Sequence, residues 1–307
     1  MLKSRIITTM LWNGTTLVKG SQFDNSRRAG SPITTIKIYN NRDVDEILFL
    51  DIEKTKSSLE GMDINFYKEL TDECDVPITI GGGINKISDI DDLLFSGADK
   101  ILINSSLYSN PGLLNDSANK FGSQTIVVGI DFKKVNGKYL CVKNSGKNII
   151  DKDPLDWAGE CYKRGAGEIV LTSVDKDGSR KGFDLDLAEK TSNLTKIPII
   201  ISGGFGKINH LENLFERADP DAIAIAIRFN TPIYTYKNVM EKANSYLKGE
   251  KDFNEDVIDE TKDKKEDIQK TKHLTKSELE EHLKHAIQNE NYELAAQIRD
   301  QIKKLNR

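Results

Sequence analysis

The sequence predicts an α/β fold, a (β/α)8 TIM barrel built from two half-barrels and followed by an α-helical hairpin. Eight short runs rich in Ile, Val and Leu alternate with helical patterns, as parallel strands covered on both faces require. These runs are residues 6–10, 47–50, 78–80, 101–103, 126–130, 169–171, 197–201 and 223–227. About 247 of the 307 residues are available for eight βα units, which is the size of such a barrel.

An internal repeat divides the barrel into two halves. The segment 77–83 reads PITIGGG and the segment 198–204 reads PIIISGG, at an offset of 121 positions. The segment 46–51 matches the segment 168–173 at an offset of 122 positions. Equivalent positions of the two halves can therefore be compared within this one chain.

The chain changes character after residue 247. Residues 248–273 read as a charged linker, because 16 of these 26 residues are charged and few apolar side chains remain to offset the entropy of ordering. Residues 274–307 begin with a capping box at 275–278 and predict two short helices joined by a turn. The two apolar stripes are Leu279, Leu283 and Ile287, then Ala295, Ile298, Ile302 and Leu305.

Composition and charge argue against several classes of function. A net charge of −4 gives no basic footprint for nucleic acid, and no apolar run approaches the roughly 20 residues of a membrane span. The three cysteines lie far apart, which argues against a disulfide framework or a CxxC metal site. His282 and His285 have metal-ligand spacing but no evident third ligand. With no signal-peptide pattern at the N-terminus, we expect a cytoplasmic protein without metal, cofactor, nucleic-acid or membrane partners.

Glycine pairs follow the third and seventh predicted strands. Glycines at strand ends let backbone N–H groups approach a phosphate closely, although tight-turn chemistry alone also explains a single pair. Because the pairs occupy symmetric positions, we expect a ligand with a phosphate at each end, lying across the barrel mouth. The predicted binding residues are Gly82, Gly83, Asn104, Ser105, Gly203 and Gly204, with the strand end at 226–227.

Asp131, at the end of the fifth predicted strand, is the best candidate for a general acid or base, the alternative being a carboxylate that caps the next segment. An offset of 120 positions places Leu11 at the equivalent end of the first strand, so a two-carboxylate mechanism would lack its first member. Asp51 and Asp177 lie near the ends of the second and sixth strands, with Asp175 beside the latter. Contacts to substrate hydroxyls and solvated loop charges are both open interpretations.

Residues 1 to about 247 resemble the HisF family, the cyclase subunit of imidazole glycerol phosphate synthase. The matching motifs are Arg5-Ile6-Ile7, Val18-Lys19-Gly20 and the segments 49–52, 81–84, 98–100, 121–124 and 165–168. The resemblance implies that a HisH-like glutaminase docks at the N-terminal face and that its ammonia crosses the barrel past a gate of four charged residues. Those positions hold Arg5, Glu46, Lys100 and Glu168. The alternative is a salt-bridge layer that seals the barrel bottom.

The departures from the family pattern are as informative as the matches. The family uses two aspartates, of which Asp131 matches the second and Leu11 replaces the first, and Ile227-Arg228 alters a phosphate-binding strand end. This pattern resembles HisF-like proteins of surface-polysaccharide synthesis, including the WbuZ-type group. It implies a subunit of a glutamine-dependent complex that passes ammonia to a sugar amidotransferase, with weak cyclase activity or none.

Two alternatives stay open at this point. The first is the family's lyase reaction in histidine biosynthesis, in which ammonia and a phosphoribulosyl substrate with a phosphate at each end give imidazole glycerol phosphate and an aminoimidazole ribotide. The second is an adaptor that acts through the hairpin, which resembles the UVR motif of UvrB and UvrC at residues 295–305. Because a hairpin of this size buries little surface by itself, we expect it to bind an unknown partner or to self-associate through its apolar stripe.

Overall fold

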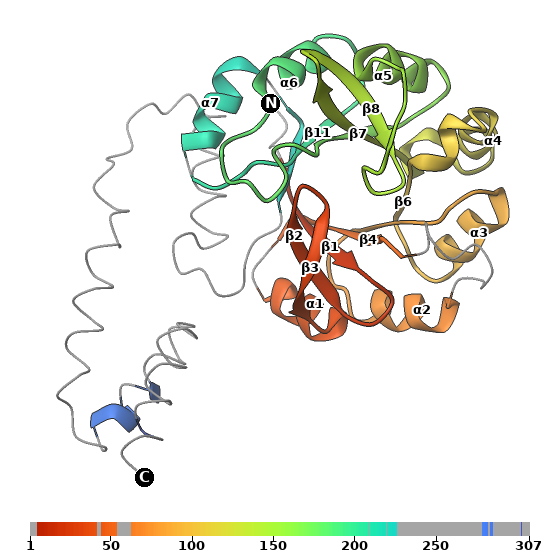
Figure 1. Cartoon of the computed structure of the whole chain (residues 1–307). Helices are drawn as coiled ribbons and strands as arrows, with labels where there is room; N and C mark the ends of the chain where they lie inside the picture. The colour runs from red at the N-terminus through yellow and green to blue at the C-terminus, as the bar shows by residue number, and fades with distance from the viewer. Residues whose placement is uncertain are drawn as a thin grey trace. The chain divides into compact units, whose positions relative to one another are not determined.

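Eight parallel strands lie side by side and close into a barrel, with helices around the outside (Figure 1). The computed structural model describes residues 5–41, 44–53, 63–207, 209–218 and 220–225, with 278–281, 283, 284 and 302. The barrel strands are β1 (Arg5–Trp12), β4 (Glu46–Asp51), β5 (Ile78–Gly81), β6 (Lys100–Ile103), β7 (Ile126–Val135), β10 (Glu168–Ser173), β11 (Ile199–Ser202) and β12 (Ala222–Ile225). Pairing of β7 with β10 and of β12 with β1 closes the ring, which confirms the predicted fold.

Helices follow the barrel strands and cover their outer faces. They are α1 (Pro32–Asn40), α2 (Ile64–Asp72), α3 (Ile87–Phe95), α4 (Gly112–Phe121), α5 (Pro154–Lys163), α6 (Leu185–Ser192) and α7 (Asn209–Arg217), with 3-10 turns η1 (Ser105–Tyr108) and η2 (Ser123–Thr125). Local chemistry sets where they begin. At α5, for example, the Asp153 carboxylate accepts a hydrogen bond from the Leu155 N–H at 2.8 Å, and Pro154 occupies the first position.

Two hairpins extend the sheet beyond the eight predicted strands. They are formed by β2 (Leu17–Ser21) with β3 (Asp24–Gly30), and by β7 with β8 (Lys138–Lys143), which also pairs with β9 (Asn148–Ile149). Gln22 and Phe23 turn the first hairpin with φ of 54° and 65°. Asn136 and Gly137 turn the second with φ of 48° and 81°, and Asn-Gly is a strong hairpin signal in a sequence.

Alternate side chains of the barrel strands point inward and form successive layers. The strand register defines an ionic layer (Glu46, Lys100, Glu168 and Ala222), two apolar layers (Ile7, Thr79, Val127 and Ile200, then Leu48, Leu102, Val170 and Ala224) and an upper layer (Thr9, Gly81, Gly129 and Ser202). Nearly all members of the apolar layers belong to one buried cluster, with Leu50 packed against it. From the N-terminal to the C-terminal end of the barrel, the inward-facing side chains are therefore charged, then apolar, then small or polar.

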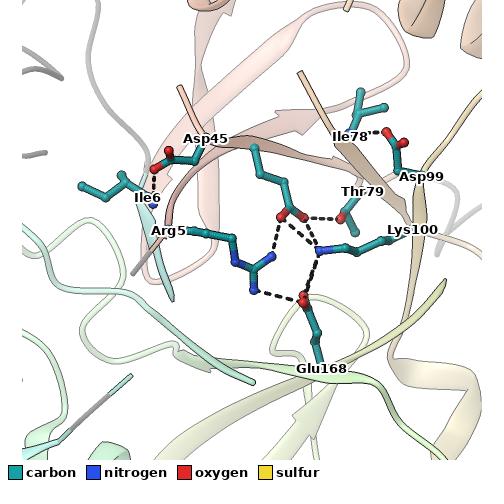
Figure 2. Close-up of polar contacts among 9 residues, drawn as sticks. Arg5, Ile6, Asp45, Ile78, Thr79, Asp99, Lys100 and Glu168 are labelled. Atoms are coloured by element: carbon teal, nitrogen blue, oxygen red, sulfur yellow. Dashed lines mark hydrogen bonds and ion pairs between the residues drawn. The ribbon is translucent and has the colours of Figure 1, made fainter. Parts of the chain in front are cut away.

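Three aspartates tie the N-terminal ends of neighbouring strands together. Asp45 accepts a hydrogen bond from the Ile6 N–H at 2.9 Å, and Asp99 accepts one from the Ile78 N–H at 2.8 Å (Figure 2). In the second half Asp221 accepts one from the Ile199 N–H at 3.0 Å. These carboxylates satisfy amide groups at the barrel's end and so fix the strands beside the ionic layer.

Most of the predicted C-terminal region lies outside the described residues. Residues 278–281, 283 and 284 are helical, as expected for the segment after the capping box. The predicted linker 248–273, the remaining hairpin including His282 and His285, and the strand end at 226–228 lie outside the described residues. In the part of the chain that is described, no helix is both long and apolar enough to cross a membrane.

Candidate functional site

The side chain of Arg5 joins the three charged residues of the ionic layer, so all four charged residues singled out in the sequence lie together (Figure 2). Glu46 accepts hydrogen bonds from Arg5 Nη1 at 2.7 Å and from Lys100 Nζ at 3.1 and 3.3 Å. Glu168 accepts hydrogen bonds from Arg5 Nη2 at 3.0 Å and from Lys100 Nζ at 3.2 Å on each carboxylate oxygen. Each carboxylate is thus bound by both cations, and the four side chains form a closed ring.

Burial makes this ring more than a surface ion-pair cluster. The exposed fraction of the side chain is 3% for Glu46, 11% for Glu168, 18% for Lys100 and 27% for Arg5. Thr79 of the first apolar layer donates a further hydrogen bond to Glu46 at 2.7 Å. Two positive and two negative charges compensate one another, as partly desolvated charges must.

Asp131 lies at the opposite end of the interior, at the barrel mouth. Asn104 Nδ2 donates a hydrogen bond to its carboxylate at 2.8 Å, and the Thr172 hydroxyl donates another. Burial raises the pKa of Asp131 to about 7, with a smaller contribution from the negative charge of Asp177, and the two hydrogen bonds oppose this rise. A carboxyl group that titrates near neutrality can give or take a proton at physiological pH, which suits a general acid or base.

The position equivalent to Asp131 holds an apolar side chain. Asp131 of β7 pairs with Thr172 of β10, and Leu11 of β1 pairs with Leu50 of β4 in the same register of the other half. The offsets of 120 and 122 positions inferred from the sequence therefore describe the pairing in space. One side of the mouth presents a carboxylate and a hydroxyl, and the other presents two leucines.

The paired glycines meet a strict backbone requirement. Gly82 has φ of 116°, and a Cβ there would lie 2.1 Å from the Asp51 carbonyl oxygen. Its counterpart Gly203 has φ of 89°, and a Cβ there would lie 2.6 Å from the Ser173 carbonyl oxygen. Gly83 and Gly204 also have positive φ. Turn geometry alone thus requires glycine here, and phosphate binding at these residues stays a prediction.

The remaining predicted site residues contact neighbouring loops and helices. Asp51 is buried and faces α2, where Tyr67 donates a hydrogen bond to it at 3.0 Å. Burial and the Asp51 charge raise the pKa of Tyr67 above its usual range. Asp177 accepts a hydrogen bond from the Phe23 N–H at 3.3 Å, and Ser105 Oγ accepts one from the Asn144 N–H at 3.1 Å. Substrate contacts of Asp51, Asp177 and Ser105 stay predictions.

Sequence reasoning missed the partners that orient these groups. Thr172 and Tyr67 carry no motif, since their roles depend on strand register and on how α2 packs against β4. Phe23 holds Asp177 only because the β2–β3 hairpin, itself not predicted, reaches the loop after β10. Among the described residues no group of three or more His, Cys, Asp or Glu side chains is arranged to hold a metal ion.

Comparison with known proteins gives two family matches. Residues 6–232 match the model of a family described as histidine biosynthesis protein, and residues 276–307 match the model of the UvrB/uvrC motif. The first match covers most of the chain, including every residue of the interior layers.

Curated relatives align along almost their whole length. A protein of Flavobacterium johnsoniae named imidazole glycerol phosphate synthase subunit HisF is 42% identical over 231 residues, which are 75% of this chain and 91% of the relative. A Campylobacter jejuni protein named putative imidazole glycerol phosphate synthase subunit hisF2 is 43% identical over 243 residues, 79% of this chain and 96% of the relative. A HisF subunit of Clostridium botulinum is 39% identical over 252 residues, 81% of this chain and 98% of the relative.

Proposed function

We propose that this chain, which belongs to the histidine biosynthesis protein family, is the ammonia-using subunit of an imidazole glycerol phosphate synthase complex. The observation that carries the proposal is the order of the barrel interior, in which two apolar layers lie between the ionic layer and Asp131. The names of the three relatives support this reaction over sugar amidation, which none of them mentions. The expectation of surface-polysaccharide amidation therefore takes second place.

In this proposal a HisH-like glutaminase binds at the N-terminal face and releases ammonia beside the ionic layer. Ammonium would have to leave its hydration shell to enter the apolar layers, which costs far more than the entry of neutral ammonia. The ionic layer and the apolar layers together then favour passage of the neutral, nucleophilic form. Arg5, Glu46, Lys100 and Glu168 are the proposed gate.

At the mouth, ammonia meets a phosphoribulosyl substrate held by its two phosphates. Gly82, Gly83, Asn104 and Ser105 are the proposed contacts of one phosphate, and Gly203 and Gly204 those of the other. Addition of ammonia to a carbonyl carbon and loss of water need proton transfers at nitrogen and oxygen. Asp131, with its pKa raised to about 7, is the proposed group that both accepts and donates these protons.

The test is a reconstitution with glutaminase and a genetic complementation. The chain, co-purified with a HisH-like glutaminase, is supplied with glutamine and the phosphoribulosyl substrate, and imidazole glycerol phosphate is measured. In parallel the gene is introduced into a bacterium that lacks its cyclase subunit and is grown without histidine. We expect slow product formation and slow growth, because one carboxylate is missing at Leu11. Absence of both from a folded, glutaminase-bound chain would refute the proposal.

Leu11 itself favours a second candidate function. With no ionisable group at this position, the barrel would conduct ammonia to a different acceptor, the sugar substrate of a separate amidotransferase. The two functions differ in a simple assay, because the second predicts glutamine-dependent amidation only when the amidotransferase is present and no imidazole glycerol phosphate at any time. An adaptor role for residues 274–307 is tested separately by pull-down with that segment alone.

A further inference from the structure

Thr9 places a hydroxyl group inside the barrel without a hydrogen-bond partner among the described residues. It belongs to the upper layer, directly above the apolar layers on β1. Its Oγ1 atom is buried and has no hydrogen-bond partner among the residues that the structure describes. A buried hydroxyl without a partner costs folding free energy, so its presence at an interior position calls for an explanation.

Asn104 presents a second buried acceptor above the same layers. Its Nδ2 atom is engaged by the Asp131 carboxylate at 2.8 Å, an arrangement that an ionised carboxylate requires because it can only accept hydrogen bonds. Its Oδ1 atom is left buried, with no hydrogen-bond partner in the described part of the chain. The carboxamide of Asn104 therefore places an unpartnered acceptor, Oδ1, next to the side chain of Asp131.

Position separates these two atoms from the other unpartnered groups. Buried polar atoms without a partner in the described residues also occur on Thr8, Ser106, Tyr108, Trp157 and Ser192. Thr8 is fully buried but alternates with Thr9 along β1, so its side chain faces the surrounding helices. Thr9 and Asn104 alone among them extend the inward-facing rows of β1 and β6, at the end of the apolar route.

We propose that Thr9 Oγ1 and Asn104 Oδ1 each serve as a hydrogen-bond acceptor for ammonia in the region between the apolar layers and Asp131. The inference rests on the proposed function, in which ammonia crosses the barrel. Ammonia has three N–H donors and one lone pair, and an acceptor oxygen binds it through one of its N–H groups. The lone pair then stays free for the carbonyl carbon of a substrate at the mouth. Thr9 and Asn104 act here as binding residues that add no proton transfer of their own.

The first test compares Thr9→Val with Thr8→Val in the complex with glutaminase. Both substitutions remove one buried, unpartnered hydroxyl from the same strand at nearly constant volume, but only the first faces the interior. The ratio of the glutamine-driven rate to the rate with saturating ammonium chloride measures delivery. We expect this ratio to fall about three- to tenfold in Thr9→Val, the loss of one hydrogen bond, and to stay unchanged in Thr8→Val and Thr9→Ser. An unchanged ratio in Thr9→Val overturns the inference.

The second test needs no catalysis and so separates this inference from the proposed function. Crystals of the full chain are soaked in hydroxylamine, a neutral ammonia surrogate near pH 7 whose two heavy atoms distinguish it from water. We expect its density within hydrogen-bond distance of Thr9 and Asn104 in the unmodified chain and in Thr8→Val, and none in Thr9→Val. No density in the unmodified chain, or equal density in Thr9→Val, overturns the site. If the complex forms no product from the phosphoribulosyl substrate but the hydroxylamine density behaves as expected, the proposed function is wrong and the ammonia site is still supported.

Discussion

Leu11 and Asp131 occupy equivalent positions in the two halves of the barrel. Each is inward-facing, and each pairs with the corresponding residue of the next barrel strand, Leu50 for Leu11 and Thr172 for Asp131. The repeated backbone therefore offers the same geometry to two side chains of opposite chemistry. A carboxylate introduced at position 11 would face the mouth without any change of fold.

We predict that Leu11→Asp raises the rate of imidazole glycerol phosphate formation. A second positioned proton-transfer group raises the reaction rate about 10²- to 10⁴-fold. We expect an increase near the lower value, because the new carboxylate beside Leu50 is incompletely positioned. The assay is glutamine-driven product formation by the complex with glutaminase. Leu11→Asn is the matched control, since it has similar size and polarity but no ionisable group. A rate equal in both variants would show that proton transfer at this position is not limiting.

Asp131 is predicted to make folding stability depend on pH. Its pKa is raised from 3.8 to about 7, so between these values the folded chain holds a proton that the unfolded chain has released. Its contribution to stability is greatest below pH 4, falls as pH rises, and levels off above pH 7, a total loss of up to about 4 kcal/mol.

Asp131→Asn removes this dependence, so it should be more stable than the unmodified chain at pH 8 and nearly equal to it at pH 4. Urea unfolding at intervals across this range measures the effect. Asp186→Asn, which alters an exposed carboxylate paired with Arg217 at 2.9 Å, is the control and should keep the slope of the unmodified chain. Parallel stability curves for Asp131→Asn and the unmodified chain would contradict the prediction.

Lys100→Met is predicted to lower both stability and the coupling of glutamine hydrolysis to product formation. Lys100 is bound to both carboxylates of the ionic layer, and its loss leaves Arg5 as their remaining cation. Breaking a buried pair costs about 3–5 kcal/mol, and the partial exposure of Lys100 places it near the lower value. Thermal unfolding and the ratio of product formed to glutamine consumed measure the two effects.

Lys120→Met is the matched control for this change. Lys120 pairs with Asp91 on the outer surface, where both side chains are about half exposed. Its loss should cost less than about 1 kcal/mol and leave the coupling ratio intact. Equal effects of Lys100→Met and Lys120→Met would mean that the ionic layer has no special part in ammonia transfer.

Alanine at Gly82 or Gly203 is predicted to destabilise the barrel by more than backbone strain alone. At both positions the new Cβ would collide with a carbonyl oxygen of the neighbouring strand end. Gly137 provides the comparison, because it has φ of 81° and nothing within 4 Å of its Cβ position. We expect about 1 kcal/mol for Gly137→Ala and clearly more for the other two in denaturant unfolding. Similar values at all three positions would show that the strand ends relax.

Sequence patterns predicted the barrel because its strands are buried on both faces, which leaves continuous apolar runs and a repeat. The ionic layer was expected from the resemblance to the HisF family, which implies four charged residues at the barrel bottom, among them Glu46 and Lys100. The β2–β3 and β8–β9 segments were missed because β3 and β9 have no apolar run and β2 and β8 have only short ones, although Asn136-Gly137 marked one turn. The unpartnered Thr9 hydroxyl could not be predicted, since it depends on which of two adjacent threonines faces inward.

Ala222 is the fourth member of the ionic layer, and its methyl group stands where the repeat places Lys100 in the first half. At this level the barrel interior is therefore asymmetric, because β12 contributes a methyl group where the other three strands contribute long charged side chains. Substitution of Ala222 by a larger apolar residue would fill more of the barrel interior at this level without altering its charge. This one position makes it possible to test the effects of size and of charge on the proposed passage of ammonia separately.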